Sequence, residues 1–331
     1  MAGPHKHDIS GKINPEISVE NEYRQNLVYY FKVGKQEFIS EQSEVAIVFL
    51  LINTPLDYMK ASLNSALIVT NDIDIIVGYR DSNDIKDLPK DPRIKFLDLG
   101  FSDSYLTYTP RQTYVPFTEP EFFKLVQLKW QLLQTCINLG YLFIVYSDLD
   151  VVWLRNPIPT LIQYFNDNVD VHVQVQDFTL DLGHPQLCMG FIALRNSIVS
   201  RAFLAKCQDK HQLELEKDKF YGDDNALTDI YKELDKPNWI EKLPSTTFPV
   251  GNLALLYSNR SRFPGQLPHK PFIFHANFAV GEVMKTVLLR SVSTNQETFL
   301  LPLGTRLRIS ILFQFIRFKA LIRKTLRTIK H

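Results

Sequence analysis

Short apolar runs alternate with amphipathic segments along the first 200 residues of the chain. Continuous apolar runs of strand length stand at 44–52 (EVAIVFLLI), 73–79, 94–99, 141–146 and 169–175. Runs that stay apolar at successive positions are typical of strands covered on both faces. Because segments with helical spacing separate these runs, the pattern predicts an α/β fold in which crossover helices connect the strands of a mostly parallel sheet.

Helices are predicted where apolar residues recur three and four positions apart. The Asn-Thr-Pro run at 53–55 breaks the first strand and should open a helix that continues to Val69, with Thr54 as its N-cap. A second helix is predicted over 122–139, and Gly140 is a residue that favours helix C-termini. The remaining predicted helices are 197–208 and 224–233.

Length and composition fit a globular protein with one large domain. The chain has 331 residues, of which 45% are hydrophobic and 22% are charged. We expect a flexible lead-in at 1–22, an α/β domain at 23–297 and a basic amphipathic segment at 298–331. The 3 cysteines have no paired spacing, so the sequence predicts neither a disulfide framework nor a zinc cluster.

The C-terminal segment is strongly basic. Residues 299–331 hold eight Lys and Arg and no acidic residue, which leaves 29 basic and 36 acidic residues in the rest of the chain. Apolar residues recur there at helical spacing: Ile311, Phe315, Phe318, Ile322, Leu326 and Ile329. A basic amphipathic helix can lie on an anionic membrane surface. Packing on its own domain and binding an acidic protein are the alternatives, and no nucleic-acid motif accompanies the segment.

The N-terminus carries no apolar segment that would serve as a secretory signal. Residues 1–10 are polar, and no run in the chain approaches the roughly 18 apolar residues of a membrane-spanning helix. These features predict a cytoplasmic protein, either free or held peripherally on a membrane.

Two carboxylates follow the apolar run that ends at Tyr146. Asp148 and Asp150 are one residue apart, and side chains at i and i+2 of an extended segment point to the same side. Two carboxylates held together repel each other unless a cation compensates them. Oxygen ligands suit Mg²⁺ and Mn²⁺, which also bind substrate phosphates. The pattern predicts a divalent-cation site, with a solvated acidic turn as the alternative.

Other polar residues could complete such a site. His275 follows the apolar run 272–274 and could be a third metal ligand, and Lys285 could bind a phosphate as a point charge. Asp223 and Asp224 precede a predicted helix. They are either acids that favour the positive end of the helix dipole or carboxylates that stabilise positive charge at a reacting carbon.

The run 129–157 resembles glycosyltransferase family 77, a family of nucleotide-diphospho-sugar transferases. In that family a helix ending in Gly precedes a strand and the pattern D-x-D-V-x-W-L-R-x-P, and this chain reads DLDVVWLRNP at 148–157. Looser similarities lie at 177–196, 222–227 and 275–285. The resemblance covers roughly residues 44–290, and it implies a GT-A fold with a Rossmann-like sheet.

The resemblance also implies an activity. It implies a retaining enzyme that uses Mn²⁺ (or Mg²⁺) to transfer a sugar, galactose or xylose first, from a UDP-sugar to a glycan, glycoprotein or lipid-linked acceptor. The implied metal ligands are Asp148, Asp150 and His275. The implied donor contacts are Thr54, Lys129, Asp148, Gly281 and Lys285. The implied catalytic residues are Asp223, which matches the Asp of a D-Q segment, and Asp224, which stands at the Gln.

The chain departs from the family pattern at two positions. Cys188 stands where an Asn often contacts the donor sugar, and Asp224 replaces the Gln of D-Q. The acceptor-binding loops are expected around 105–117 and 178–185. The Cys188 departure bears on which sugar the donor carries, and the Asp224 departure changes the polarity at the reacting centre.

Two other functions compete with sugar transfer. In a haloacid-dehalogenase-like phosphatase, Asp148 would be the nucleophile and Asp150 the general acid. However, about four predicted strands precede Asp148, and that interpretation leaves His275 and the Trp-Leu-Arg-Asn-Pro run without a role. A non-catalytic protein that binds sugar nucleotides is the second alternative.

Overall fold

The protein is described from a computed structural model. It describes residues 43–52, 54–80, 83, 85–99, 115, 119–166, 168–176, 186–250, 271–277, 285–286, 289–290 and 292. All of them belong to one unit, Gln42–His331. The predicted lead-in 1–22, the basic segment 298–331, the candidate residue Gly281 and the expected acceptor loop 178–185 lie outside the described residues, as does 105–117 apart from Val115.

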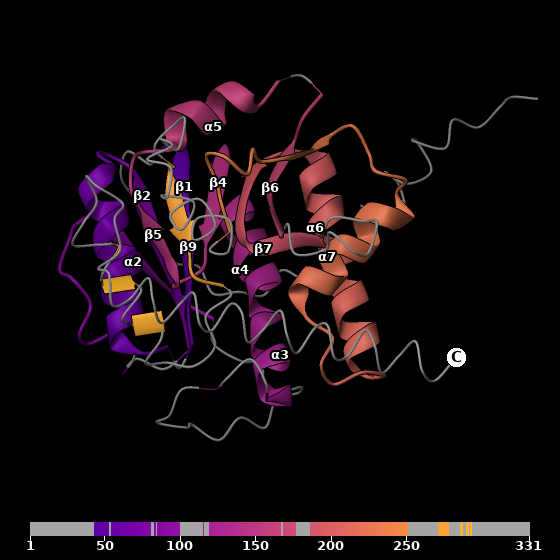
Figure 1. The fold of residues 1–331 in the computed structure, drawn as a ribbon, viewed down its shortest axis with the longest axis horizontal. Helices are drawn as coiled ribbons and strands as arrows, with labels where there is room; N and C mark the ends of the chain where they lie inside the picture. The colour runs from indigo at the N-terminus through magenta and orange to yellow at the C-terminus, as the bar shows by residue number, and fades with distance from the viewer. Residues whose placement is uncertain are drawn as a thin grey trace, which may run out of the picture. The chain divides into compact units, whose positions relative to one another are not determined.

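A seven-stranded sheet forms the centre of the described part, in the order β3-β2-β1-β4-β7-β6-β8 (Figure 1). Its strands are β1 (Val45–Leu51), β2 (Asp74–Tyr79), β3 (Ile94–Asp98), β4 (Phe143–Ser147), β6 (Val171–Gln176), β7 (Gln186–Arg195) and β8 (Ile240–Lys242). Neighbouring strands pair in parallel, except that β7 is antiparallel to both β4 and β6. The prediction of a mostly parallel sheet is therefore confirmed, whereas β7 and β8 were not predicted.

Helices cover both faces of the sheet in the described part (Figure 1). One face carries α2 (Leu56–Val69), α5 (Ile158–Tyr164) and a small two-stranded sheet of β5 (Val151–Trp153) and β9 (Ile273–His275). The other face carries α4 (Leu128–Asn138), α6 (Ile198–Leu215) and α7 (Asp223–Glu233). Successive residues of β1 point to opposite faces: Phe49 joins the cluster of α2, and Val48 joins the cluster of α4. This explains why the run 44–52 is apolar without interruption.

The predicted N-cap of the first helix is wrong. Pro55 occupies the N-cap position of α2, and no side chain caps the helix. The hydroxyl of Thr54 donates to the backbone oxygen of Ile52 instead, at 3.1 Å. Pro55 keeps an extended backbone conformation (ψ 133°), so the helix begins one residue later than Thr54 would allow as its cap.

The predicted helix 122–139 consists of two helices. α3 (Pro120–Val126) and α4 are separated at Gln127, whose backbone oxygen accepts from the amide of Trp130 at 3.1 Å. The rings of Phe122, Phe123 and Phe220 stack edge to face, whereas the apolar side of α4 packs on the sheet. The two halves therefore bury their apolar side chains against different partners.

The predicted helix 197–208 is confirmed and extends further, to Leu215. The hydroxyl of Ser197 accepts from the amide of Ser200 at 3.1 Å and caps α6. Among the described residues, no helix combines the length and the apolar composition that crossing a lipid bilayer would require.

Candidate active site

Asp148 and Asp150 lie in the tight turn that connects β4 to β5. The amide of Val151 donates to the backbone oxygen of Asp148 at 3.2 Å and closes this turn. The extended geometry expected for the two acids is therefore wrong, because the chain must leave the main sheet to pair β5 with β9 on its face. The turn still brings one carboxylate oxygen of Asp148 within 4.8 Å of one carboxylate oxygen of Asp150.

His275 reaches this turn through the small sheet. β5 and β9 pair antiparallel with Val151 opposite His275, and the amide of Ala276 donates to the backbone oxygen of Asp150 at 2.9 Å. This ladder places Nε2 of His275 3.2 Å from Oδ1 of Asp150. One ligand atom each from Asp148, Asp150 and His275 lies within 4.8 Å of the other two. The structure thus brings together the three residues that the sequence suggested as metal ligands.

A glycine keeps the space between these ligands open. A Cβ atom built on Gly190 would lie 2.3 Å from Cε1 of His275 and 2.8 Å from Oδ2 of Asp148. The backbone oxygen of Gly190 also accepts from the amide of Asp148 at 2.8 Å. Any side chain at this position would fill the space that a cation between the three ligands needs, so the residues present fit a metal ion.

Gly190 comes to this position because β7 bulges there. Val173 on β6 faces Ile192 on β7, but the next residue, Gln174, faces Cys188. The three residues 189–191 therefore have no partner on β6, and they approach the end of β4 instead. Bulges redirect backbone and side chains next to active sites, and this one delivers Gly190 to the ligand cluster.

Lys285 contributes positive charge to the same cluster. Its Nζ atom lies 2.5 Å from Oδ2 of Asp150. Burial would raise the pKa of the Asp150 carboxyl, but Lys285 and His275 outweigh it and hold that pKa well below its usual range. Asp150 is therefore an anion in the described structure, compensated by two cationic or hydrogen-bonding nitrogens, as a metal-binding carboxylate should be.

Lys129 joins the predicted metal ligand to a predicted catalytic acid. Its buried Nζ lies 2.9 Å from Oδ1 of Asp148 and 2.6 Å from Oδ2 of Asp223. Burial alone would lower the pKa of Lys129, but Asp148 and Asp223 raise it well above its usual value. Lys129 is thus a charged ammonium that pairs with two carboxylates, those of Asp148 and Asp223.

A buried hydrogen-bonded chain holds Lys129 and Asp223 in place. The indole Nε1 of Trp130 donates to Nδ1 of His211 at 3.0 Å. Nε2 of His211 in turn donates to the backbone oxygen of Tyr221 at 3.2 Å. α4, α6 and the start of α7 are therefore fixed to one another immediately beside Lys129 and Asp223.

Asp224 is engaged with the bulge of β7. Its two carboxylate oxygens accept from the amide of Met189 and from Nε2 of Gln176, both at 2.6 Å. Burial and the neighbouring Asp223 raise the pKa of Asp224 to about 7. Because Met189 lacks a partner on β6, Asp224 supplies the acceptor that the bulged amide needs.

Two residues of the site were missed by the sequence interpretation. The hydroxyl of Tyr146 donates to Oδ1 of Asp148 at 2.7 Å. Oε1 of Gln174 accepts from Nδ1 of His275 at 2.7 Å. Gln174 did carry a signal, because a polar residue in a strand covered on both faces must find a buried partner.

Thr54 is the remaining predicted donor contact among the described residues. Thr54 follows β1, whose Val48 pairs with Tyr146 of β4, so it lies at the same edge of the sheet as the acid pair. Cys188 is buried, with its Sγ 3.9 Å from both Nδ1 of His275 and Nδ2 of Asn277. Within the described part of the chain, the buried Oδ1 of Asn277 has no hydrogen-bond partner.

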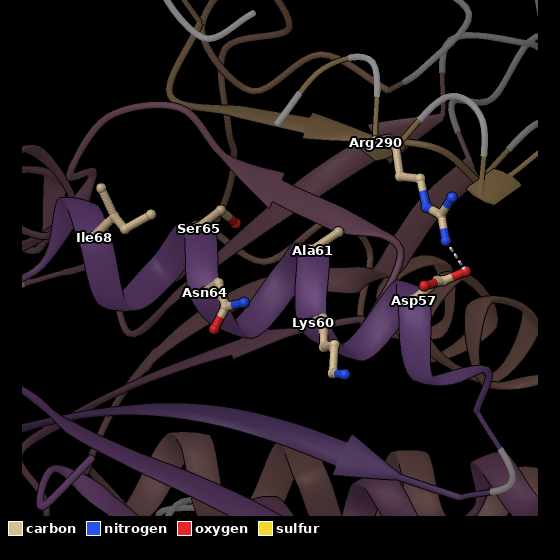
Figure 2. Close-up of a pocket in the computed structure, with 7 residues that line it drawn as sticks. All are labelled: Asp57, Lys60, Ala61, Asn64, Ser65, Ile68 and Arg290. Atoms are coloured by element: carbon tan, nitrogen blue, oxygen red, sulfur yellow. Dashed lines mark hydrogen bonds and ion pairs between the residues drawn. The ribbon is translucent and has the colours of Figure 1, made fainter. Parts of the chain in front are cut away.

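A separate surface pocket lies along the outer side of α2. Figure 2 shows the Arg290 side chain reaching the start of this helix, where it pairs with Asp57 at 2.6 Å. The pocket has a volume of about 230 Å³ and is lined by Asp57, Lys60, Ala61, Asn64, Ser65, Ile68 and Arg290. None of the predicted site residues lines it.

Fold and site together define a class of protein. Two carboxylates and one imidazole beyond the carboxyl end of a strand, in a mostly parallel α/β sheet, are the surroundings in which a divalent ion binds a phosphorylated ligand.

The chain belongs to the nucleotide-diphospho-sugar transferase family, because the profile of that family matches residues 101–289, more than half of the sequence. This family membership does not favour a phosphatase. No curated protein matches the chain.

Several solved structures are similar to the described fold. The apo form of the glycosyltransferase GlyE of Streptococcus pneumoniae TIGR4 aligns with a TM-score of 0.48 and 13% identity, over 78% of this chain and 62% of that one. The galactosyltransferase LgtC in complex with donor and acceptor sugar analogues aligns with a TM-score of 0.48 and 12% identity, over 79% of this chain and 99% of that one. This chain thus spans less than two thirds of GlyE.

Proposed function

We propose that the chain is a retaining glycosyltransferase, of family 77, that transfers a sugar from a UDP-sugar to a glycan, glycoprotein or lipid-linked acceptor. The observation that carries this proposal is the convergence of Asp148, Asp150 and His275, with ligand atoms within 4.8 Å of one another. In a nucleotide-diphospho-sugar transferase, a cation at this position would bridge the protein and the donor diphosphate. Mn²⁺ is the proposed ion, and galactose or xylose the proposed sugar.

Each residue of the cluster has a distinct part in this proposal. Asp148, Asp150 and His275 hold the ion, which when bound neutralises charge on the departing nucleotide. Lys285 lies 2.5 Å from Asp150, so a diphosphate that reaches the cluster also comes within reach of its ammonium. We assign Lys285, with Gly281 and Thr54, to donor binding. This division makes Asp150 the residue whose loss should affect turnover most.

The proposed catalytic carboxylate is Asp223. Lys129 holds it at 2.6 Å and the metal ligand Asp148 at 2.9 Å, so the two acids are kept at a defined separation. A carboxylate there would stabilise the positive charge that develops on the sugar as the diphosphate leaves. Asp224 supports the same region by holding the Met189 amide at 2.6 Å. We therefore assign Asp223 to the reacting sugar and Asp224 to the shape of the site.

Asn277 is a further candidate for contact with the donor sugar. Its buried Oδ1 lacks a hydrogen-bond partner within the described part, and a buried acceptor without a partner is costly. Its Nδ2 lies against Cys188, the residue that replaces the Asn of the family pattern. A sugar hydroxyl that donates to Oδ1 would satisfy this acceptor.

The proposal is tested by a donor screen. Purified protein is incubated with a panel of UDP- and GDP-sugars with Mn²⁺ or with EDTA, and the released nucleoside diphosphate is measured. We expect slow Mn²⁺-dependent hydrolysis of one or two UDP-sugars, with the released or transferred sugar keeping its anomeric configuration by NMR. Cleavage of p-nitrophenyl phosphate with Mg²⁺ and no action on any nucleotide sugar would instead indicate a phosphatase. Activity on neither substrate would indicate a binding protein.

A further inference from the structure

We propose that Gln174 is a positioning residue that fixes the tautomer of His275 and so presents the Nε2 lone pair of that imidazole to the metal ion. The inference rests on the proposed metal site and adds to it a residue that does not touch the ion. It concerns only the arrangement of His275, so it can fail while the metal site itself stands.

The orientation of the Gln174 amide follows from its surroundings. Its Nε2 atom lies 3.1 Å from the backbone oxygens of both Phe248 and Pro249. Backbone oxygens only accept hydrogen bonds, so the amide nitrogen, and not the amide oxygen, must face them. The residue is fully buried, at 0% exposure, so water cannot replace these contacts. The amide oxygen is therefore directed at His275.

The tautomer of His275 follows from that orientation. Nδ1 of His275 lies 2.7 Å from Oε1 of Gln174, and a carboxamide oxygen cannot donate. Nδ1 must then carry a proton, which in a neutral imidazole leaves the lone pair on Nε2. Nε2 is the atom that lies 3.2 Å from Oδ1 of Asp150, in the cluster with Asp148. This short contact between a lone pair and a carboxylate is favourable only when a proton or a cation shares it.

Gln174 also joins the two sides of the His275 backbone. The Phe248–Pro249 segment that its amide nitrogen holds leads directly into Val250, which forms a parallel bridge with His275. The β5–β9 ladder fixes the other side of that residue. The backbone of His275 is thus held by strand pairing, whereas rotation of the ring and choice of tautomer are controlled by the Gln174 oxygen. Removing such an outer partner typically lowers metal affinity by about 10- to 100-fold.

Two substitutions separate the acceptor from the rest of the side chain. Gln174→Met keeps the length but removes the acceptor for Nδ1–H and the two donated bonds. Gln174→Glu keeps an acceptor for Nδ1–H but replaces the donating nitrogen by an oxygen that faces the backbone oxygens of Phe248 and Pro249. Gln134→Met is the matched control, because Gln134 donates to Oε1 of Gln208 at 2.7 Å, and both residues lie on helices α4 and α6 away from the metal ligands.

The measurement is the dissociation constant of Mn²⁺ alone, from the electron paramagnetic resonance signal of the free ion. We expect Gln174→Met to bind Mn²⁺ roughly 10- to 100-fold more weakly than the wild type. Gln174→Glu should stay close to the wild type, and Gln134→Met should equal it. Wild-type affinity in Gln174→Met would overturn the inference. Equal losses in Gln174→Met and Gln174→Glu would also overturn it, because the effect would then come from the contacts to Phe248 and Pro249.

A measurement on the unmodified protein covers the case in which Gln174→Met does not fold. In the Zn²⁺-loaded wild type, ¹⁵N NMR of the imidazoles should show His275 protonated at Nδ1 and coordinated through Nε2, with a His275→Asn sample to assign the signal. Coordination through Nδ1 would refute the role of Gln174. If the wild type binds neither Mn²⁺ nor Zn²⁺, the proposed metal-dependent function fails together with the role of Gln174. If the wild type binds the metal and only the expected difference between the variants is missing, the role of Gln174 alone fails.

Discussion

Two buried aspartates at opposite edges of the sheet show what separates a structural ion pair from a candidate site. Asp170 stands before β6, at its amino end, and Asp150 follows the carboxyl end of β4. Each side chain is 10% exposed and each has a cationic partner. Burial and charge are therefore alike in the two, and the difference must lie in how their partners are arranged.

Asp170 and Arg195 form a closed pair. Nε of Arg195 donates to Oδ1 of Asp170 at 2.9 Å, and the backbone amide of Arg195 donates to the backbone oxygen of Asp170 at 2.9 Å. Strand pairing alone brings the two together. Asp150, in contrast, meets His275 and Lys285, which come from distant segments, beside the space kept by Gly190. Distant polar groups that converge around an open space, and not the burial of a charge, therefore distinguish the functional edge of the sheet, which lies at the carboxyl end of β4.

The largest expected effect comes from removing the charge at each edge. Asp150→Asn should lower donor turnover by about 10³-fold, because the ion loses a ligand and the diphosphate loses its electrostatic support. Asp170→Asn should lower the Tm through the unpaired Arg195 and leave the turnover of folded protein unchanged. Turnover and thermal unfolding of both variants test this. Wild-type turnover in Asp150→Asn would show that the metal assignment is wrong.

The next effect tests whether the open space matters as much as the ligands. Gly190→Ala should lower Mn²⁺ affinity by roughly 100-fold, because its methyl group would overlap the ring of His275 at 2.3 Å. Gly78→Ala is the control. Its methyl group would lie 2.8 Å from the flexible Cδ atoms of Leu132, so it should cost stability without a change in Mn²⁺ affinity. Equal Mn²⁺ affinity in the two variants would contradict the role given to Gly190.

The functional edge was only partly predictable from sequence. The strands that pair in parallel were found because both of their faces are buried, which leaves an uninterrupted apolar run such as 44–52. Asp148 and Asp150 were found because two acids after such a run need compensation. β9 is only three residues long and gains its meaning from pairing with β5, so the sequence indicated His275 without showing how it reaches Asp150.

Other features depend on contacts that no local pattern records. β7 was missed because Gly190 interrupts its apolar run, and the bulge that requires this glycine exists only between β6 and β4. Gln174 was missed because its partners lie at 248–249 and 275, far along the chain. The prediction of Thr54 as an N-cap was wrong because its hydroxyl donates to the backbone oxygen of Ile52, which precedes the helix.

A smaller effect distinguishes Lys285 from an ordinary structural partner. In the described structure its ammonium occupies Oδ2 of Asp150, so it competes with a metal ion for that oxygen. Lys285→Met should therefore tighten binding of Mn²⁺ alone by about tenfold, or ~1.4 kcal/mol. The same change should weaken binding of UDP in the presence of Mn²⁺, because the diphosphate loses a cation. Calorimetric titrations with Mn²⁺ alone, and with UDP in the presence of Mn²⁺, test whether the two affinities change in opposite directions. Lys210 is a surface lysine paired with Glu233, so the control variant Lys210→Met should change neither affinity.

The smallest effect concerns pH, and it comes from Asp224. Burial and Asp223 raise the pKa of Asp224 to about 7, above the roughly 3.9 of an unfolded aspartate. The folded state then binds more protons than the unfolded state between these values. The contribution of Asp224 to stability is therefore fully present below about pH 4 and is lost as pH rises through about 7, by at most about 1.4 kcal/mol per pH unit.

Asp224→Asn removes this titration and keeps an oxygen that can accept from the Met189 amide. Its free energy of unfolding, measured in urea from pH 4 to 8, should lack the decline that Asp224 adds in the wild type. The difference between the two proteins should therefore change between about pH 4 and 7 and level off above that range. A constant difference for Asp224→Asn would mean that the carboxyl is ionised throughout, and the bulge of β7 would then be held by a full negative charge at the edge where the donor is proposed to bind.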